Sequence, residues 1–441
     1  MHDADRNIVL VTVDSLRADY CSFLGSNAPE TPHLDALASE GVVFENAIAP
    51  GPRTPISVPE TLTGVPMPTL GDCPDEERAR HIADHVAENA TLPEQLASRG
   101  YTTAAVNANP WTSSWTGFDD EFDTFVDHTD VTEVSPVVQS LLSVLGGTHA
   151  GTMALWAGRW FHNSQFFSQW PTLYDDVKRL VDTLPEPYFL WVFLMDTHNP
   201  YVVPREYREE SSTLGMYYSL LRSNRALTHS GDSALQEDMP KRIHRGILNA
   251  YRDSVRSVDS FVGRLHDDMG EEAILAVHSD HGEAFGDHGT YGHHQVLYEE
   301  NIRVPLIVAD GGEESGLRVT DPISLRSLTP MLSARGHGEP IDGRWVEELV
   351  TSRTQDGRAI AVRGANKKYV EDDETERFYD LREDSGERRG LSGDDIDDAR
   401  RYRAKARSFK QTVPEKPSPT VKHSRGISES RVKLLEELGY R

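Results

Sequence analysis

Short apolar runs, separated by longer polar segments, recur along most of the chain. The runs are Ile8–Val13, Thr102–Val106, Tyr188–Met195, Ala273–Val277 and Val304–Ala309. Two stretches between them, Leu92–Arg99 and Arg242–Met269, repeat their apolar residues with the spacing of a helix. Apolar runs of this length are typical of strands that are buried on both faces of a parallel sheet. Because these strands alternate with helices, the pattern predicts an α/β fold with a mostly parallel sheet flanked by helices.

The pattern changes after about residue 342. Three shorter runs follow there, Ala359–Arg363, Lys367–Val370 and Arg377–Leu381, and they predict a small second sheet. We therefore expect two parts. Residues 1–341 would form a large α/β domain, and residues 342–441 a small C-terminal α+β subdomain with this sheet, a charged segment and a terminal helix.

Three further segments have weaker patterns. Residues 131–170 are apolar but irregular, and we interpret them as a helical insertion over the active face. Residues 384–425 are charged and partly disordered in composition. Glu429–Leu438 has the spacing of a short amphipathic helix, which would close the chain.

The charge balance of the chain is strongly acidic. Lys and Arg total 45 against 71 Asp and Glu, which gives a formal net charge of −26. This balance opposes binding to nucleic acid or to anionic lipid. The acidic residues are spread along the chain, which is typical of a solvated acidic surface, as in halophilic proteins from salt-rich cytoplasm. A site for an anionic ester must therefore create its own positive field, most simply with a metal ion.

Compartment signals in the sequence are few. The two cysteines, Cys21 and Cys73, do not define a disulfide framework. The N-terminus shows no basic region followed by an apolar one, and no apolar stretch approaches the roughly 20 residues that a transmembrane helix needs. We expect a cytoplasmic protein without a transmembrane segment.

Carboxylate and imidazole side chains follow the predicted strands at their carboxyl ends. Asp14 follows the first strand, and Asp280 with His281 follows the fourth. In open α/β sheets, sites form outside the carboxyl ends of the strands. Asp14 by itself could also be a helix N-cap, but together with Asp280 it becomes a candidate metal ligand. Two carboxylates and an imidazole suit one divalent ion: oxygen ligands favour Ca²⁺, Mg²⁺ or Mn²⁺, and imidazole favours Zn²⁺.

Several motifs occur in an order that is specific to one family. They are V-D-S-L-R-A-D at 13–19, S-D-H-G-E at 279–283, L-Y-E-E-N-I-R-V-P at 297–305, and K-K-Y-V at 367–370 leading to F-Y-D-L at 378–381. This series resembles the motifs of sulfatases and related members of the alkaline phosphatase superfamily. The resemblance runs from Asn7 to about Leu391.

The resemblance implies an alkaline phosphatase-like fold and a set of metal ligands. Asp14, Asp280 and His281 occupy positions at which the family binds a divalent ion, with Ca²⁺ favoured. Many sulfatases carry two adjacent aspartates where this chain has Val13-Asp14, so one carboxylate ligand of the family is missing. Arg17 and Asp19 are expected to be local pairing partners.

The nucleophile position departs from the family pattern. Sulfatases carry C/S-x-P-x-R at the head of a helix, with Thr-Gly downstream, and their nucleophile is converted to formylglycine. Counting back from Thr63-Gly64 places Thr54 at this position, with Val58 in place of the motif arginine. A threonine hydroxyl that binds a divalent cation at a helix N-terminus can attack sulfur or phosphorus in line. A capping role for Thr54, with Pro55 at the first helical position, is compatible with this chemistry.

The resemblance also implies substrate-binding and proton-transfer residues. His198 lies in the element D-T-H-N-P-Y, whose histidine contacts the substrate or its leaving group in the family. His293 stands where many sulfatases have a lysine, and its neighbour His294 could exchange roles with it. We assign His198 and His293 to assistance of the leaving group.

Two more residues would replace family residues that this chain lacks. Arg53, next to Thr54, would supply the positive charge of the missing motif arginine. Ala108 and Pro110 stand where the family has a lysine and a histidine, so Asn109, or Asn107, would contact the ester instead. We assign Arg53, Asn109 and His294 to substrate binding.

The sequence leaves three functions open. The first is a metal-dependent hydrolase of sulfuric esters with Thr54 as nucleophile. The second is a phosphodiester or phosphonate ester hydrolase, or a phosphoglycerol transferase, with the same site; a two-metal form would recruit Asp196, His198 and His293. The third is a metal-dependent binder of anionic glycans without turnover. The partner in each case is a small anionic ester, such as a sulfated glycan or a lipid headgroup.

Overall fold

The structure of the protein is a computed structural model, which describes residues 5–25, 28–71, 73–129, 167–228, 239–270, 273–310, 316–391 and 398–414. The expected insertion at 131–170 lies outside these residues apart from its last part, 167–170. The expected terminal helix at Glu429–Leu438 also lies outside them.

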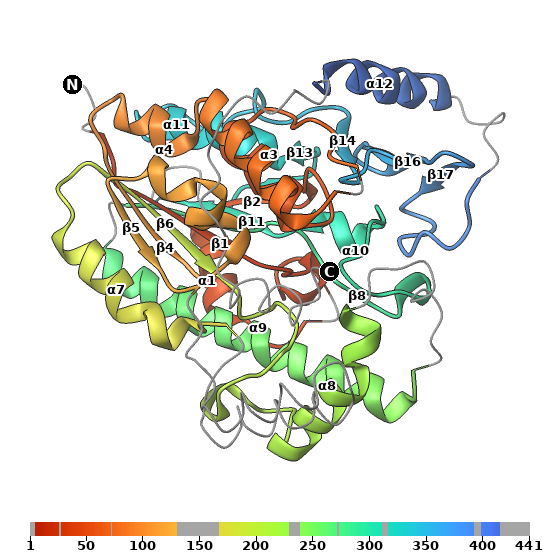
Figure 1. The fold of residues 1–441 in the computed structure, drawn as a ribbon, viewed down its shortest axis with the longest axis horizontal. Helices are drawn as coiled ribbons and strands as arrows, with labels where there is room; N and C mark the ends of the chain where they lie inside the picture. The colour runs from red at the N-terminus through yellow and green to blue at the C-terminus, as the bar shows by residue number, and fades with distance from the viewer. Residues whose placement is uncertain are drawn as a thin grey trace.

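A large mixed sheet forms the centre of the molecule (Figure 1). Its strands, in spatial order, are β12 (Arg318–Val319), β2 (Gly41–Phe44), β11 (Leu306–Ala309), β7 (Ile274–Ser279), β1 (Ile8–Val13), β6 (Tyr188–Leu194), β4 (Thr102–Asn107) and β5 (Thr124–Asp127). The strands β7, β1, β6, β4 and β5 run parallel to their neighbours in this order. The predicted α/β fold with a mostly parallel sheet is confirmed.

The register of the three central strands brings their ends to one level. Val13 of β1 pairs with Leu194 of β6 on one side and with Ser279 of β7 on the other. All residues of these three strands are buried, which explains their continuous apolar character. The residues that follow each strand therefore emerge side by side at the carboxyl edge of the sheet.

The fifth predicted strand, Val304–Ala309, differs from the expectation. Pro305 divides it, since proline has no N–H to donate to a neighbouring strand. Residues Arg303–Val304 form β10, which pairs with β3 (Ala47–Ile48) in a separate small sheet together with β13 (Ile323–Ser324). The remainder, β11, runs antiparallel to β7 and β2.

Helices cover both faces of the large sheet (Figure 1). One layer contains α1 (Pro32–Glu40), α7 (Trp170–Thr183) and α9 (Lys241–Met269), with α8 (Thr213–Thr228) packed on α9. The other contains α3 (Asp75–Glu88), α4 (Leu92–Ala97) and α11 (Leu328–Arg335), and α2 (Thr54–Thr63) packs against α3 and α11. The helices predicted at Leu92–Arg99 and Arg242–Met269 are present as α4 and α9.

Short elements complete the described chain. The hairpin β8 (Ala284–Phe285) and β9 (Tyr291–Gly292) follows β7, and α10 (Glu299–Ile302) precedes β10. Single 3-10 turns occur at Ala18–Tyr20, Pro110–Thr112, Ser114–Thr116, Phe118–Glu121, Arg205–Tyr207, Asp287–Gly289 and Leu325–Ser327.

A second, antiparallel sheet lies toward the C-terminus. Its strands are β14 (Val350–Arg353), β15 (Ile360–Arg363), β16 (Lys367–Glu371) and β17 (Glu376–Asp380). The helix α12 (Ala399–Thr412) covers it with one apolar face, formed by Tyr402, Ala406 and Phe409 (Figure 1). The expectation of partial disorder over 384–425 is wrong for this helix, because the spacing of its apolar residues outweighs the charged composition. The division of the chain near residue 342 remains a proposal.

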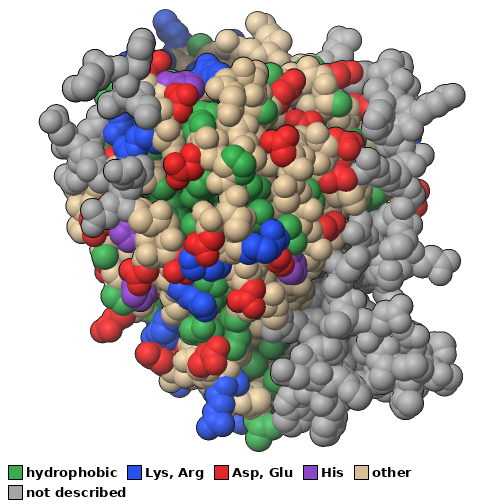
Figure 2. Space-filling model, turned by 90° about the vertical axis from the view of Figure 1, so that its left-hand side faces the viewer, with side chains coloured by type: hydrophobic (Ala, Val, Ile, Leu, Met, Phe, Trp, Pro, Cys, Tyr) green, Lys and Arg blue, Asp and Glu red, His purple; other side chains and the backbone are tan. Residues whose placement is uncertain are grey.

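Charges are mixed over the surface. Figure 2 shows Asp and Glu side chains scattered over one face of the molecule, with Lys and Arg side chains between them. Within the described part of the chain, the structure contains no helix with the length and apolar character needed to cross a membrane.

Candidate active site

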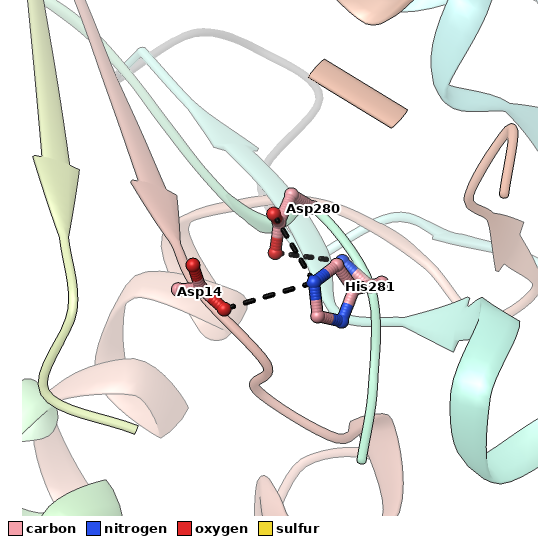
Figure 3. A group of neighbouring side chains, drawn as sticks. All are labelled: Asp14, Asp280 and His281. Atoms are coloured by element: carbon pink, nitrogen blue, oxygen red, sulfur yellow. Dashed lines mark hydrogen bonds and ion pairs between the residues drawn. The ribbon is translucent and has the colours of Figure 1, made fainter. Parts of the chain in front are cut away.

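Three side chains converge at the carboxyl edge of the large sheet (Figure 3). Asp14 follows β1, and Asp280 and His281 follow β7. Each offers one ligand atom, and these atoms all lie within 4.8 Å of one another. His281 Nε2 is 3.7 Å from Asp14 Oδ1 and 3.5 Å from Asp280 Oδ2. The three side chains are fully buried, so the site is shielded from bulk water.

Backbone groups fix the orientation of Asp280 and His281. The Nδ1 atom of His281 is 2.8 Å from the Gly282 carbonyl oxygen, which can only accept a hydrogen bond. Nδ1 must therefore carry the proton, and Nε2 turns its lone pair toward the carboxylates, as a metal-ligating imidazole requires. Asp280 Oδ1 accepts hydrogen bonds from the backbone N–H groups of His281, at 2.8 Å, and of Ser15, at 3.2 Å.

The Asp14 carboxylate is held by two side chains. Ser15 Oγ donates to Asp14 Oδ1 at 2.7 Å, and Asn109 Nδ2 donates to Asp14 Oδ2 at 2.7 Å. The second amide atom of Asn109, Oδ1, accepts from the Trp111 N–H at 2.8 Å. Asn109 was predicted to contact the ester. The structure shows its amide bonded to a candidate metal ligand, and contact with the ester stays a prediction.

Ser15 is a residue that sequence reasoning missed. It contacts both candidate carboxylates, Asp14 through its hydroxyl and Asp280 through its N–H. Its φ of 61° lies in the left-handed region, which residues other than glycine rarely adopt. A strained backbone at a ligand-binding turn is common in functional sites, but no pattern in the sequence reveals it in advance.

Burial dominates the electrostatics of the two candidate carboxylate ligands. Burial, and then the neighbouring Asp280, raise the pKa of Asp14. Burial raises the pKa of Asp280 to about 7. Two buried carboxyl groups that lie beside one another and beside an imidazole are the donor set of a divalent cation. The residues present therefore fit the metal that the sequence predicts.

Thr54 begins α2 and directs its hydroxyl at this group. Its Oγ1 is 2.8 Å from Asp280 Oδ2, 3.4 Å from Asp14 Oδ2 and 3.4 Å from His281 Nε2. Its hydroxyl faces these three side chains rather than the N–H groups of α2, so the capping interpretation is not what the structure shows. One turn later Ser57 Oγ donates to the Asp280 carbonyl at 2.6 Å and fixes the helix against β7.

Three imidazoles form a row beside Thr54. The ring centroid of His293 is 5.0 Å from that of His198 and 5.0 Å from that of His281. His198 Nδ1 lies 2.6 Å from the carbonyl oxygen of Asn199, and therefore carries the proton. Burial lowers the pKa of both His198 and His293, which makes them neutral in the absence of an anion. The structure thus brings both residues next to the candidate metal ligands.

Glu283 and Tyr201 were also missed by sequence reasoning. Glu283 is fully buried, accepts a 3.0 Å hydrogen bond from the Tyr201 hydroxyl, and lies 3.4 Å from His293 Nδ1. Burial raises its pKa well above the usual range. The signal was in the sequence, because Glu283 ends the S-D-H-G-E motif and Tyr201 ends D-T-H-N-P-Y.

Arg53 and His294 lie at the margin of this group. Arg53 is buried at the N-cap of α2. Burial lowers the pKa of His294, and the charge of Arg53 lowers it further. His294 Nε2 is buried and has no hydrogen-bond partner in the described structure. Both residues were predicted to bind the substrate, and that role stays a prediction.

Asp196 does not join the site. Its carboxylate accepts a hydrogen bond from the Trp170 N–H at 3.2 Å and so caps the start of α7. Burial raises its pKa to about 7. A two-metal form would thus lack one of its predicted ligands, and within the described residues the structure shows one metal-ligand group, formed by Asp14, Asp280 and His281.

Arg17 and Asp19 are local pairing partners, as expected. Arg17 pairs with Asp19 and with Asp287, each at 2.8 Å, and donates to the Glu283 carbonyl at 3.0 Å. This arginine therefore supports the loop that follows the metal-ligand group.

Comparison with known proteins gives a consistent picture. A sequence model of the family described as "Sulfatase" matches residues 6–334. The chain is 24% identical to a sulfatase of Formosa agariphila, across 86% of this chain and 82% of that protein. It is 24% identical to an arylsulfatase of Clostridium perfringens, across 80% of each, and 25% identical to human iduronate 2-sulfatase, across 78% of this chain and 66% of that enzyme.

Solved structures share the fold. A phosphonate monoester hydrolase of Agrobacterium radiobacter aligns with a TM-score of 0.65 at 18% identity, covering 92% of this chain and 95% of that one. A protein solved in complex with its substrate D-glucosamine-2-N,6-O-disulfate aligns with a TM-score of 0.64 at 14% identity, covering 93% and 98%. Likeness at these identities establishes an alkaline phosphatase-like fold and leaves the substrate open.

Proposed function

The chain belongs to the sulfatase family of the alkaline phosphatase superfamily, and on that premise we propose that it hydrolyses sulfuric esters with Thr54 as the nucleophile and one bound divalent ion. One observation carries this proposal: the Thr54 hydroxyl is within 3.4 Å of all three candidate metal ligands. A threonine that only capped or packed a helix would not need to face two buried carboxylates and an imidazole.

Asp14, Asp280, His281 and Thr54 would hold the ion. When bound, a divalent ion lowers the pKa of a ligating hydroxyl and neutralises the charge of an anionic ester. Two carboxylates and a hydroxyl favour Ca²⁺, as the family does, and also suit Mg²⁺ or Mn²⁺, while the imidazole of His281 favours Zn²⁺. The identity of the ion is thus a proposal, and a metal titration tests it.

In the first step, Thr54 Oγ1 forms a bond to sulfur while the bond from sulfur to the leaving oxygen breaks. The closest acceptor for the Thr54 proton is Asp280 Oδ2, at 2.8 Å. The leaving oxygen takes a proton from His198 or His293, whose protonated forms a bound anion would favour. The buried N-terminus of α2 and Arg53 would stabilise the sulfate oxygens, with His294 beside them.

In the second step, water attacks sulfur and gives one proton to the histidine that protonated the leaving oxygen. The bond from sulfur to the Thr54 oxygen breaks, Thr54 takes back the proton held by Asp280, and hydrogen sulfate leaves. This step differs from that of formylglycine enzymes, in which a second hydroxyl of the aldehyde hydrate expels the sulfate. A threonine sulfate has no second hydroxyl, so it must be hydrolysed. The same residues would process a phosphate intermediate, which makes ester hydrolysis at phosphorus the second candidate function.

The second candidate is supported by a structural likeness. The structure of a phosphonate monoester hydrolase aligns with 92% of this chain at a TM-score of 0.65. The sulfate assignment is supported by the family and by relatives named for sulfate esters. The partner would be a small anionic ester, and one structural neighbour is bound to a sulfated sugar. A cytoplasmic location stays a prediction from the sequence.

The test measures turnover of p-nitrophenyl sulfate, p-nitrophenyl phosphate and bis-p-nitrophenyl phosphate with Ca²⁺, Mg²⁺, Mn²⁺ or Zn²⁺. We expect metal-dependent release of p-nitrophenol from the sulfate ester. Thr54→Ala should abolish it, and the matched variant Thr54→Ser should retain it because it keeps the hydroxyl. Faster turnover of a phosphate ester would favour the second candidate, and metal binding without turnover of any ester would favour a non-catalytic binder. Full activity of Thr54→Ala would refute the nucleophile.

A further inference from the structure

A buried glutamate lies beside the row of imidazoles. Glu283 follows His281 by two residues, at the start of the β8 hairpin, and its side chain is fully buried. It is not a member of the metal-ligand group formed by the described residues. A carboxyl group is unfavourable in a protein interior unless hydrogen bonds compensate the loss of water. The contacts of Glu283 therefore indicate what this residue does.

The main chain of Glu283 is fixed on both sides. Its N–H donates to the Glu300 carbonyl at 2.9 Å, and its own carbonyl accepts from Arg17 at 3.0 Å. Gly282, which precedes it, has no room for a side chain, because a Cβ there would lie 2.0 Å from the Glu300 carbonyl oxygen. The backbone thus delivers the Glu283 side chain in one direction.

The two carboxyl oxygens of Glu283 have different surroundings. Oε2 accepts a 3.0 Å hydrogen bond from the hydroxyl of Tyr201. Tyr201 is itself buried, and its ring packs against the rings of Tyr251 and Phe285 with centroids 5.4 and 5.8 Å apart. Oε1 is buried and has no hydrogen-bond partner among the described residues. A donor that moves toward Oε1 would therefore be favoured.

His293 lies within reach of that oxygen. Its Nδ1 atom is 3.4 Å from Oε1 and 3.4 Å from Oε2 of Glu283. Hydrogen bonds between catalytic groups are often long before substrate binds, and they shorten in the complex. When Glu283 accepts this bond, the proton is held on Nδ1, and Nε2 on the other side of the ring faces away from the glutamate.

His198 has a different kind of partner. Its Nδ1 donates to the backbone carbonyl of Asn199 at 2.6 Å. A carbonyl orients an imidazole but carries no charge, whereas a carboxylate orients the ring and also stabilises its protonated form. Of the two histidines assigned to the leaving group, His293 therefore has the partner that suits a proton donor.

We propose that Glu283, held by Tyr201, is a positioning residue that orients His293 as the proton donor to the leaving oxygen. As the bond from sulfur to that oxygen breaks, its electron pair stays on the oxygen, which takes the proton from His293 Nε2. Nδ1 keeps its proton and its hydrogen bond to Glu283. The attacking water of the second step returns a proton to Nε2. The inference rests on the proposed function for the ester at Thr54.

The kinetic test compares p-nitrophenyl sulfate with phenyl sulfate, whose more basic leaving oxygen depends more on a proton donor. Glu283→Ala should lower kcat for phenyl sulfate at least about 100-fold and for p-nitrophenyl sulfate less than about tenfold. KM should change little, because the histidine acts on the bond that breaks. Glu283→Gln keeps an acceptor and should restore most of the loss. Tyr201→Phe removes only the hydroxyl, so it should show a smaller loss with the same selectivity and keeps the test valid if Glu283→Ala does not fold.

The matched control is Glu387→Ala, which removes another buried glutamate, one that pairs with Lys368 at 2.7 Å. Any loss of kcat in this variant should be equal for the two esters. Titration calorimetry with Ca²⁺ and Mn²⁺ should give the same affinity for Glu283→Gln as for the wild type, because the proposed role does not involve the ion.

A spectroscopic test needs no turnover. Nuclear magnetic resonance of protein labelled with ¹⁵N-histidine reports which ring nitrogen of His293 carries the proton, and His293→Gln assigns the signal. We expect a proton on Nδ1 in the wild type and in Glu283→Gln, and loss of this signature in Glu283→Ala.

Four outcomes would overturn the inference. They are an equal loss of kcat for both esters in Glu283→Ala, the same selective loss in Glu387→Ala, weaker ion binding by Glu283→Gln, and an unchanged Nδ1 signature in Glu283→Ala. If the wild type hydrolyses neither ester, the proposed function fails. A signature that still depends on Glu283 would then support the pairing of the two residues by itself.

Discussion

The side-chain amide of Asn109 donates a 2.7 Å hydrogen bond to the Asp14 carboxylate. A neutral amide in this position orients the carboxylate without competing for the cation. Residues that hold metal ligands in this way often affect affinity nearly as much as the ligands themselves.

The first prediction concerns this contact. Asn109→Ala should weaken the binding of the divalent ion roughly 10- to 100-fold, because Asp14 is then free to rotate away from Asp280. Titration calorimetry with Ca²⁺ and Mn²⁺ measures the affinity, and far-ultraviolet circular dichroism checks that the variant is folded. An unchanged affinity would contradict the orienting role of Asn109.

The second prediction concerns the two buried carboxylates. Adding the correct divalent ion should raise the Tm of the protein, because the ion binds the folded state and not the unfolded one. At an ion concentration of 100 times the Kd, this binding stabilises the folded state by roughly 3 kcal/mol. Asp280→Asn should reduce this effect strongly. It should also raise the Tm of the metal-free protein, because it removes one of two negative charges that are buried together. Scanning calorimetry with and without a chelator measures both shifts, and a metal-free Asp280→Asn that melts lower would contradict this account.

The third prediction concerns a buried ion pair below the nucleophile helix. Glu60 of α2 accepts hydrogen bonds from Arg353 of β14, at 2.8 Å, and from Arg326, at 2.7 Å. Arg353→Met should lower the free energy of unfolding by about 3–5 kcal/mol, because it leaves a buried carboxylate with one partner fewer. The double variant Glu60→Gln/Arg353→Met should regain part of this loss. Urea unfolding of the wild type, of Arg353→Met, of Glu60→Gln and of the double variant measures the coupling between the two residues. Additive losses in the two single variants would exclude it.

The fourth prediction concerns pH. Burial lowers the pKa of His85 to about 4, and its Nε2 donates to the Thr63 hydroxyl at 3.0 Å while Asn89 faces Nδ1. As the pH falls from about 6.5 to about 4, the unfolded chain takes up a proton that folded His85 does not, so the wild type loses stability. The variant His85→Gln lacks this loss. The free energy of unfolding of the variant minus that of the wild type should therefore increase by roughly 3 kcal/mol as the pH falls from 7 to 4. Urea unfolding at several pH values tests the slope, and a constant difference would refute it.

Much of the fold and of the site follows from simple patterns. The apolar runs at Ile8–Val13 and Ala273–Val277 predicted two strands of one mostly parallel sheet. The rule that sites form at the carboxyl ends of such strands, with the family resemblance, predicted that Asp14 and Asp280 bind one metal ion. The resemblance to the sulfatase motif, counted back from Thr63-Gly64, placed Thr54 at the head of a helix, where the structure also has it. Each of these inferences uses a periodicity or an interval, which a linear sequence records directly.

Other contacts depend on geometry that no interval encodes. The hydrogen bond from Asn109 to Asp14 needs the turn after β4 to place an amide beside β1, and no sequence pattern predicted it. The left-handed backbone of Ser15 and the reversed direction of β11 are likewise set by packing against neighbours. The helix α12 was missed because composition, rather than periodicity, was used to interpret its segment.

The burial of α2 has a consequence for the origin of the site's chemistry. All ten of its residues, from Thr54 to Thr63, are buried, so no other macromolecule can reach this helix in the folded protein. An enzyme that modified residue 54 covalently would have to act on the nascent, unfolded chain. An unmodified threonine removes that dependence. Such a protein would mature wherever it folds, including hosts that lack any modifying machinery for this position.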